Sequence, residues 1–391
     1  HFLWISTVGY GLNRYDRRSD TFRHYRHDPD NRESISSDTV FSITAGKNGE
    51  IWLGTDRGLN RWMPGSNRFR SYLHHAEKPN SISNNSVYTV FRDSQNMLWV
   101  GTAFGLNRFD PVAESFRRFY TEPSNKNSLS LNTVLSILED RDGYIWVGTY
   151  GGSLNRYDRK TDTFKRYIHQ ADNHKSISNN FILVIYQSSN GDLWFGTHNG
   201  LNRLIPGTDH FERILNKHGL PNNVINGIIE DKKGVLWIST NNGLSQFNPL
   251  NKTFRNFDKD DGLQSNEFNS GAYFKGASGR IYFGGVNGLT EFYPDQVRRN
   301  PHKPSIVLTD FMLFNRSVPI HEKTRSGFIL NRHVQYMETI VLDYTDYIFA
   351  FEFSALNYNN PRKNRYRYKL KGFDPDWTET DFRNRRVTYT N

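Results

Sequence analysis

The sequence predicts an all-β protein: a seven-bladed β-propeller of four-stranded blades, followed by a partial β-sandwich of the immunoglobulin or fibronectin type III kind. A Trp two residues ahead of Gly-Thr or Ser-Thr recurs six times, and a seventh copy, IYFGG, keeps the pattern in weaker form. These aromatic residues stand 43 to 48 residues apart: Trp4, Trp52, Trp99, Trp146, Trp194, Trp237 and Tyr282. Such an interval is the length of one propeller blade, although rings of six or eight blades remain alternatives.

Residues 134–167 show the pattern of one complete repeat. VLSILE is followed by the turn DRDG, then by YIWVGT, the connection YGG, SLNRYD, the turn RKTDT and FKRY. Apolar and polar residues alternate within the short segments, and Gly and Asp separate them, which predicts a four-stranded meander. The VLSILE-type pattern is clear only from Val40 onward. We therefore expect the first blade to lack its innermost strand, unless upstream residues or ring closure supply one.

Two positions of the repeat are expected to build the core between blades. The Trp and the residue two positions later share one face of the second strand, because side chains alternate along a strand. The later residue is Gly in five repeats and Ser in the other two, at Ser6 and Ser239. A small residue lets a neighbouring sheet approach closely, so we predict that both positions are structural.

The repeat ends after Tyr293, and the following RRNPHKP has the composition of a linker. We predict a propeller over residues 1–297, a linker over 298–304 and a β-sandwich over 305–391. IVLTDFMLF and the alternating aromatic residues of 347–353 predict two strands of the sandwich. The first residue lies inside a repeat and the last follows a predicted strand. We therefore expect a segment cut from a longer chain, with a sandwich truncated at its C-terminus.

Composition excludes several classes of protein. No apolar run approaches 18 residues, which excludes a membrane span in this segment, and the absence of Cys excludes disulfides and thiolate chemistry. The net charge of +10 comes largely from basic residues between aromatic residues of the outermost strands, as in FRRFY, so we expect a solvated edge and no nucleic-acid partner. The histidines form no HxH or HExxH motif, and no acidic loop has calcium-ligand spacing, so we expect neither a metal nor a cofactor.

The repeat V-x-S-I-x-x-D-x-x-G-x-[IL]-W-[VLF]-G-T-x-x-G-L-N-R resembles the two-component-regulator propeller repeat. The tail NYNNPRKNRYRYKLKGFDPDW, followed by VTYTN, resembles the triple-tyrosine domain that follows such propellers, with Tyr366, Tyr368 and Tyr389 as candidate signature residues. The resemblance covers nearly the whole chain. It implies the periplasmic sensor region of a hybrid two-component histidine kinase or a related receptor, joined to a cytoplasmic output domain by a transmembrane helix outside this segment.

The same resemblance implies an oligosaccharide or other small-molecule ligand, a homodimer in the full-length receptor and no catalysis in this segment. In a propeller, the turns between second and third strands open on one face, where ligands usually bind. These turns vary while their frame stays constant, as expected of a displayed site but also of ordinary surface turns. Seven of their residues are the candidate ligand-binding residues: Tyr10, Arg57, Phe104, Tyr150, His198, Asn199 and Asn241. Aromatic rings stack on sugars, Arg57 suits a carboxylate or sulfate, and the amides suit hydroxyl groups.

Two sets of polar residues recur at fixed positions. One set precedes the innermost strands, and we interpret it as turn caps in preference to a polar collar around the channel: Asp38, Asn85, Asn132, Asn180, Asn222 and Asn266. The other set is the Arg of the LNR motif: Arg14, Arg61, Arg108, Arg156 and Arg203. We predict that these Arg residues form salt bridges between blades with acids such as Asp140 and Asp231.

Two other functions remain open at this point. Propellers often serve as protein-interaction scaffolds, and a contiguous apolar surface would favour that function. Propellers with similar repeats also include lyases that use one His and a metal at the channel mouth. That resemblance, the weaker alternative, draws attention to His198, the only histidine in the rim turns, and to Glu267, which is expected on the same face.

Overall fold

The computed structural model describes residues 2–298, 304–357 and 361–390. The chain divides into two compact units, His1–Val297 and Arg298–Asn391. Most of the predicted linker, 298–304, falls outside the described residues. Within the described ranges no helix is long and apolar enough to cross a membrane.

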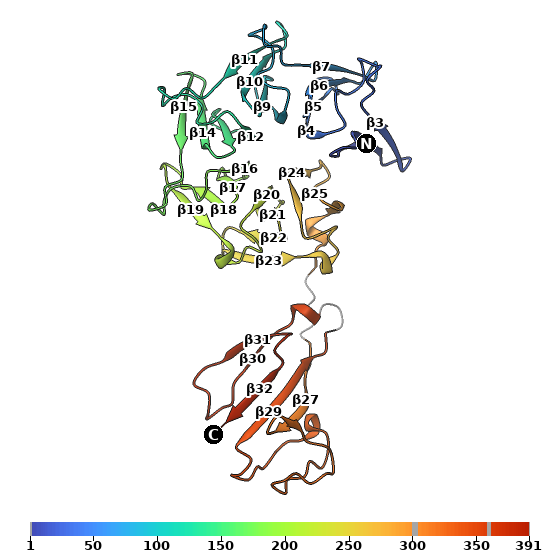
Figure 1. The fold of residues 1–391 in the computed structure, drawn as a ribbon, viewed down its shortest axis with the longest axis vertical. Helices are drawn as coiled ribbons and strands as arrows, with labels where there is room; N and C mark the ends of the chain where they lie inside the picture. The colour runs from blue at the N-terminus through green and yellow to red at the C-terminus, as the bar shows by residue number, and fades with distance from the viewer. Residues whose placement is uncertain (1, 299–303, 358–360, 391) are drawn as a thin grey trace. The chain divides into compact units, whose positions relative to one another are not determined.

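The first unit is a propeller of seven antiparallel sheets arranged around a central axis (Figure 1). The first blade contains β1 (Phe2–Ser6), β2 (Leu12–Asp16) and β3 (Thr21–Tyr25). The second and third blades contain β4 (Val40–Ala45), β5 (Ile51–Thr55), β6 (Gly58–Met63), β7 (Arg68–Tyr72), β8 (Val87–Arg92), β9 (Leu98–Thr102), β10 (Gly105–Asp110) and β11 (Ser115–Phe119). The fourth and fifth contain β12 (Val134–Glu139), β13 (Ile145–Thr149), β14 (Ser153–Asp158), β15 (Thr163–Tyr167), β16 (Ile182–Gln187), β17 (Leu193–Thr197), β18 (Gly200–Leu204) and β19 (Phe211–Ile214).

The sixth and seventh blades complete the ring. They contain β20 (Ile225–Glu230), β21 (Leu236–Thr240), β22 (Gly243–Asn248), β23 (Thr253–Phe257), β24 (Phe268–Lys275), β25 (Ile281–Gly285) and β26 (Gly288–Phe292). Three short 3-10 helices lie in the connections: η1 (Asn216–His218), η2 (Lys259–Asp261) and η3 (Pro294–Gln296).

The first and last blades each have three strands. Among the described residues the first blade has no innermost strand. The seventh has no outermost strand among them, which the sequence analysis did not anticipate. After β26 the chain passes into the 3-10 helix η3.

The repeated aromatic residues form the core between blades. Trp99, Trp146, Trp194 and Trp237 are at most 1% exposed. The residue two positions after the Trp must be small because the next blade approaches it closely. A Cβ on Gly148 would lie 2.3 Å from Oγ of Ser136 and 2.8 Å from Ile182 of the next blade. Both positions are therefore structural, as predicted.

The second unit contains two β-sheets. The larger sheet has the strand order β28 (Arg316–Ser317), β27 (Ile306–Leu313), β29 (Ile348–Ala355) and β32 (Arg386–Thr390). The smaller pairs β30 (Arg365–Tyr368) with β31 (Thr378–Asp381), and two 3-10 helices accompany them, η4 (Val334–Tyr336) and η5 (Pro361–Lys363). Tyr366 of the small sheet packs with Phe353, Val387 and Tyr389 of the large one, which gives the sandwich its shared core.

Candidate functional site

The rim turns between second and third strands are shaped by the Thr of the repeat. Thr102 is fully buried; its hydroxyl donates to the carbonyl of Gly105 at 2.9 Å and accepts the N–H of Phe104 at 3.1 Å. The same Thr-to-carbonyl bond recurs in other blades, at Thr7, Thr55, Thr149, Thr197 and Thr240. In these six blades the hydroxyl of the Thr thus fixes the backbone of the turn, and the variable side chains project from a rigid frame.

All seven predicted site residues are exposed on this rim. Tyr10, Phe104 and Tyr150 are exposed by 66%, 54% and 48%. Of the seven, Tyr150 and His198 come into ring contact, at a centroid distance of 6.1 Å. The structure therefore concentrates two of the predicted residues, from neighbouring blades, in one place.

Phe181 completes this contact into a cluster. Its ring stacks on His198 at 5.0 Å with an interplanar angle of 10°, and meets Tyr150 edge to face at 4.6 Å. Leu131, 38% exposed, lies beside Gly151 in the turn that carries Tyr150. We call Leu131, Tyr150, Phe181 and His198 the rim cluster. It presents an apolar and aromatic surface at the junction of the fourth and fifth blades.

An extra residue in the fourth blade produces this arrangement. The strands β13 and β14 close at Thr149 and Ser153, whereas β9 and β10 close at Thr102 and Gly105, one residue tighter. The longer turn lets Tyr150 form an antiparallel bridge with Phe181, which precedes β16 of the next blade. Backbone pairing therefore holds the two rings together across the blade boundary.

The imidazole of His198 behaves as a neutral aromatic ring. Burial against its neighbours lowers the pKa of His198 below its ordinary value near 6.5, because desolvation disfavours the charged form. At neutral pH the rim cluster therefore carries no charge from this residue. Its ring contacts are with Tyr150 and Phe181, and Glu267, which the lyase alternative placed nearby, is not among its described contacts.

A second aromatic pair lies on the neighbouring turn. Phe104 contacts Tyr120 with ring centroids 5.6 Å apart. Thr133 joins this turn to the rim cluster: its hydroxyl donates to the carbonyl of Ala103 at 3.1 Å, and its carbonyl accepts the N–H of Tyr150 at 2.9 Å. Aromatic side chains thus occupy the successive turns of the third, fourth and fifth blades.

The other predicted residues lie outside the rim cluster, and some of them contact other residues of the rim. The guanidinium of Arg26 lies 5.6 Å from the ring of Tyr10 in the first blade. The side-chain oxygen of Asn241 accepts from Nδ2 of Asn226 at 2.7 Å. Asn199 similarly accepts from the amide of a neighbouring Asn at 3.2 Å. Arg57 is exposed on the second blade.

Sequence reasoning missed Tyr120, Leu131 and Phe181. A signal for Phe181 exists: it directly follows one of the turn-capping Asn residues, at a position that holds Thr39, Ser86 and Thr133 in other blades. A large aromatic residue at a position that holds small hydroxyl residues in the first three of these repeats is a departure from the pattern.

Two of the five LNR arginines, Arg61 and Arg203, form salt bridges within their own blades, so the predicted inter-blade pairing was wrong for them. Arg61 forms a salt bridge with Glu50, and Arg203 with Asp192 at 3.0 Å. In each case the acid precedes the second strand of the same blade. The carboxylate of Asp140, a predicted partner, instead accepts the indole N–H of its own repeat's Trp at 2.6 Å.

The polar residues ahead of the innermost strands cap turns, as predicted. The side-chain oxygen of Asn85, for example, accepts the N–H of His74 at 2.7 Å. In the sixth blade this role falls to Asn223, which accepts the N–H of Asn216 at 2.7 Å, and not to Asn222 as the sequence analysis assigned. Asn223 stands two residues before β20, the same spacing as Asn85 before β8, whereas Asn222 stands three residues before it.

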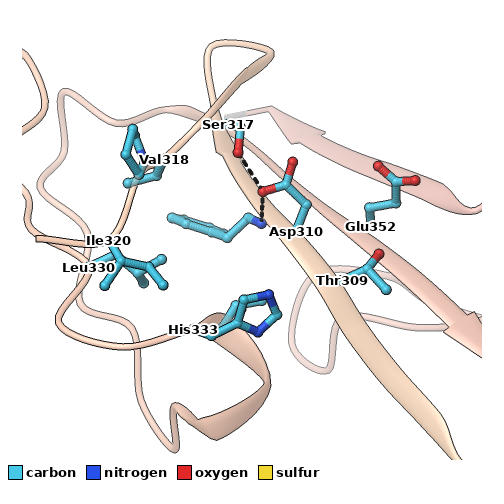
Figure 2. Close-up of a pocket in the computed structure, with 11 residues that line it drawn as sticks. Thr309, Asp310, Ser317, Val318, Ile320, Leu330, His333 and Glu352 are labelled. Atoms are coloured by element: carbon cyan, nitrogen blue, oxygen red, sulfur yellow. Dashed lines mark hydrogen bonds between the residues drawn. The ribbon is translucent and has the colours of Figure 1, made fainter. Parts of the chain in front are cut away.

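The second unit contains a separate cavity of about 510 Å³ (Figure 2). Val318, Ile320 and Leu330 line one side, and Asp310 and His333 face it from the other. The carboxylate of Asp310 is already engaged, since it accepts the N–H of Phe311 and the hydroxyl of Ser317. Among the described residues no group of three His, Cys, Asp or Glu side chains is placed to hold a metal ion.

These features define a class of protein: a repeat-built β-propeller with an aromatic cluster on its rim, followed in sequence by a β-sandwich. Five segments match the family described as Two component regulator propeller, at residues 34–57, 81–104, 128–151, 176–199 and 219–242. Residues 357–391 match the Y_Y_Y domain. The chain therefore carries two-component regulator propeller repeats and a Y_Y_Y domain, the combination that the sequence resemblance predicted.

One curated relative is Histidine kinase P4 of Formosa agariphila, 33% identical over 114 residues. The match covers 29% of this chain and 8% of the kinase, so the chain spans less than a tenth of that relative. Among solved structures, the extracellular domain of the putative hybrid two component system BT3049 from B. thetaiotaomicron is 19% identical. That alignment covers 99% of this chain and 85% of the other, with a TM-score of 0.45.

A catalytically inactive virginiamycin B lyase from Staphylococcus aureus, solved with quinupristin, is 12% identical with a TM-score of 0.54. The alignment covers 74% of this chain and 98% of the lyase. At this identity the likeness shows the propeller fold alone.

Proposed function

We propose that this chain is the periplasmic ligand-binding region of a membrane receptor of the hybrid two-component type, and that it binds an oligosaccharide on the propeller rim. The propeller repeats, the Y_Y_Y domain and the partial match to a histidine kinase support the receptor assignment. The rim cluster is the observation that carries the binding assignment. In this proposal the membrane-spanning helix lies outside this segment and the full-length receptor is a homodimer.

The chemistry of the rim suits a sugar ring. Tyr150 is 48% exposed and Phe181 is half-buried beside it. Sugars present apolar C–H faces that pack on aromatic rings, while their hydroxyls take hydrogen bonds from amides. Asn199 is adjacent in sequence to His198 and exposed, so a polar group borders the aromatic surface. A rigid turn backbone lowers the entropy lost on binding, because the displayed side chains start from a fixed frame.

Signalling requires that the ligand prefers one arrangement of the receptor over another, since a ligand that binds both equally shifts nothing. Tyr150 and Phe181 belong to different blades, so a ligand that spans them is sensitive to the boundary between the blades. We propose that this dependence is the origin of the signal.

The test is thermal unfolding of the propeller in the presence of neutral and acidic oligosaccharides at low and high salt. A ligand at 100 times its Kd stabilises the folded state by about 2.7 kcal/mol, which raises Tm by several degrees. We expect one oligosaccharide to raise Tm in the wild type and in Tyr344→Ala, an exposed aromatic control in the second unit, but not in Tyr150→Ala. Equal shifts in all three proteins would contradict the rim assignment.

Salt distinguishes the two ligand classes. A shift that weakens at high salt and in Arg57→Ala indicates an acidic oligosaccharide, because the attraction between exposed charges is screened. A shift unchanged by salt and by Arg57→Ala indicates a neutral one.

A further inference from the structure

The cavity of the second unit has two walls of different chemistry (Figure 2). All its lining residues lie between 309 and 352 in the sequence, and its volume of about 510 Å³ is in the range of small-molecule sites. Val318, Leu330 and Val334 belong to the apolar wall and are buried, and Ile320 beside them is 43% exposed. Because polar side chains form the opposite wall, the cavity suits an amphipathic ligand.

A β-bulge turns polar side chains toward this cavity. The pairing of β27 with β29 shifts between Leu308 and Asp310, so Thr309 is an extra residue in β27. In a regular strand neighbouring side chains point to opposite faces, but here Thr309 and Asp310 both line the cavity. The bulge thus brings the carboxylate of Asp310 to the cavity wall.

The polar wall carries negative charge. Asp310 lies directly opposite Glu352 in the register of β27 and β29, and both residues line the cavity (Figure 2). Like charges at opposite positions of an antiparallel pair destabilise a sheet. Glu352 is partly compensated, since its Oε2 lies 3.8 Å from Nη2 of Arg386. The described residues that line the cavity include no Lys or Arg, so the wall favours a cation.

Both hydrogen bonds that Asp310 accepts go to the same oxygen. Oδ1 accepts the N–H of Phe311 at 2.8 Å and the hydroxyl of Ser317 at 2.7 Å. Within the parts of the chain that the structure describes, Oδ2 accepts no hydrogen bond, and no Lys, Arg or His forms a salt bridge with Asp310. The carboxylate is therefore held in place by one oxygen and can accept a ligand with the other.

We propose that this cavity binds an organic ligand that carries an alkylammonium group. The ammonium contacts Oδ2 of Asp310 and the carboxylate of Glu352, where charge-assisted hydrogen bonds are stronger than neutral ones and the cation offsets the repulsion between the two acids. The alkyl chain packs along Val318, Ile320 and Leu330. An organic cation fits better than a metal ion, because no three His, Cys, Asp or Glu side chains among the described residues are placed to hold one. This site is separate from the propeller rim and does not depend on the function proposed for it.

The experiment titrates the whole chain with hexylamine and with 1-hexanol, a neutral ligand of the same length. The methyl signals of Val318, Ile320 and Leu330 are followed by NMR, so that binding is located as well as measured. We expect hexylamine to shift these signals and to bind about tenfold more tightly than hexanol, with a smaller difference at high salt. Equal affinity of the two ligands, or no shift of these signals by either, overturns the proposal.

Asp310→Asn tests the carboxylate while keeping its structural role. The amide oxygen of Asn can still accept the hydrogen bonds from Phe311 and Ser317, so the fold of the wall is retained. We expect this variant to bind hexylamine about tenfold more weakly than the wild type and to bind hexanol equally well. Glu338→Gln changes an exposed carboxylate outside the cavity lining and should bind both ligands as the wild type does. Unchanged affinity for hexylamine in Asp310→Asn overturns the proposal.

Two further ligands distinguish the sources of the alkylammonium group. A short blocked Gly peptide with a single Lys is compared with the same peptide carrying norleucine in place of Lys. Tighter binding of the Lys peptide than of hexylamine supports the site with a lysine side chain as ligand, whereas tighter binding of hexylamine supports it with a free amine. If calcium chloride shifts the three sets of methyl signals and hexylamine does not, the cavity is a metal site and the proposal is overturned.

Discussion

The indole nitrogen of Trp146 donates a 2.6 Å hydrogen bond to Oδ2 of the buried carboxylate of Asp140. The other oxygen of the same carboxylate accepts the backbone N–H groups of Asp142 and Tyr144. The equivalent Trp-to-Asp bonds in the third and sixth blades measure 2.8 and 3.1 Å. In these three blades the Asp therefore ties the turn after the innermost strand to the core between blades.

Asp140→Ala should destabilise the propeller. The variant leaves a buried indole N–H and two turn N–H groups without their acceptor, and hydrogen bonds to a charged group contribute about 1.5–3 kcal/mol each in favourable cases. We expect a loss of about 2–4 kcal/mol in the free energy of unfolding, measured by Trp fluorescence in urea. Asp142→Ala, which removes an exposed carboxylate two residues away, is the matched control and should change stability little. Equal unfolding midpoints for the two variants would contradict the role of Asp140.

Core and rim positions of the same repeat should respond differently to truncation. Trp146→Ala removes a side chain that is 1% exposed and should cost about 3–5 kcal/mol. Tyr150→Ala and Arg57→Ala remove exposed side chains and should each leave the urea midpoint nearly unchanged. A similar loss of stability in all three variants would show that the rim turns are structural and would remove their candidacy as a site.

The architecture follows from the sequence because one pattern is repeated. Trp, Gly and Thr recur where each blade needs a filler, a close approach and a turn cap, so a single interpretation predicts most of the ring. The seventh blade departs from the pattern after its third strand, where the 3-10 helix η3 follows and no fourth strand stands among the described residues. The predicted partners of the LNR arginines were wrong for a different reason: Asp140 and Asp231 accept the indole N–H of their own repeats' Trp residues. The acids that pair with Arg stand directly before the second strand, and they occur in the repeats of Arg61 and Arg203.

His198 should make stability depend on pH. Its pKa in the folded state lies below the ordinary value near 6.5, so the unfolded chain binds the proton more readily. The contribution of neutral His198 to the free energy of unfolding is therefore fully present above pH 6.5. It is lost as the pH falls through the pKa of His198 in the folded state. We expect the urea midpoint to fall further between pH 7.5 and 5.5 in the wild type than in His198→Phe, which keeps the stacked ring without the titration. An equal or smaller fall in the wild type would contradict this assignment.

Arg166 should hold the loop that leads into the fourth blade. Its Nε donates to the carbonyl of Ser128 at 2.9 Å, and Nη2 donates to the carbonyls of Asn125 and Leu129. Arg166→Ala should cost about 1–3 kcal/mol and should speed amide exchange in residues 122–129. Lys126→Ala, an exposed substitution in the same loop, is the control. Unchanged amide exchange of residues 122–129 in Arg166→Ala would contradict this role of Arg166.

The candidate site was only partly accessible from sequence. Tyr150 and His198 are visible as departures from a constant turn, but Phe181 stands on a different loop, and its place beside them depends on the extra residue in the turn of the fourth blade. Leu131 likewise joins the cluster through contact with Gly151. Contacts between loops of neighbouring blades have no fixed spacing in the sequence, so a structure was needed to assemble them.

The most direct test of the rim assignment is the Kd of the stabilising oligosaccharide, measured by isothermal titration calorimetry for the wild type, Tyr150→Ala and Tyr344→Ala. The rim assignment predicts that Tyr344→Ala binds as the wild type does and that Tyr150→Ala binds at least about tenfold more weakly, at unchanged stability of the fold. An unchanged Kd in Tyr150→Ala would place the ligand elsewhere on the molecule and would contradict the proposed sensor site.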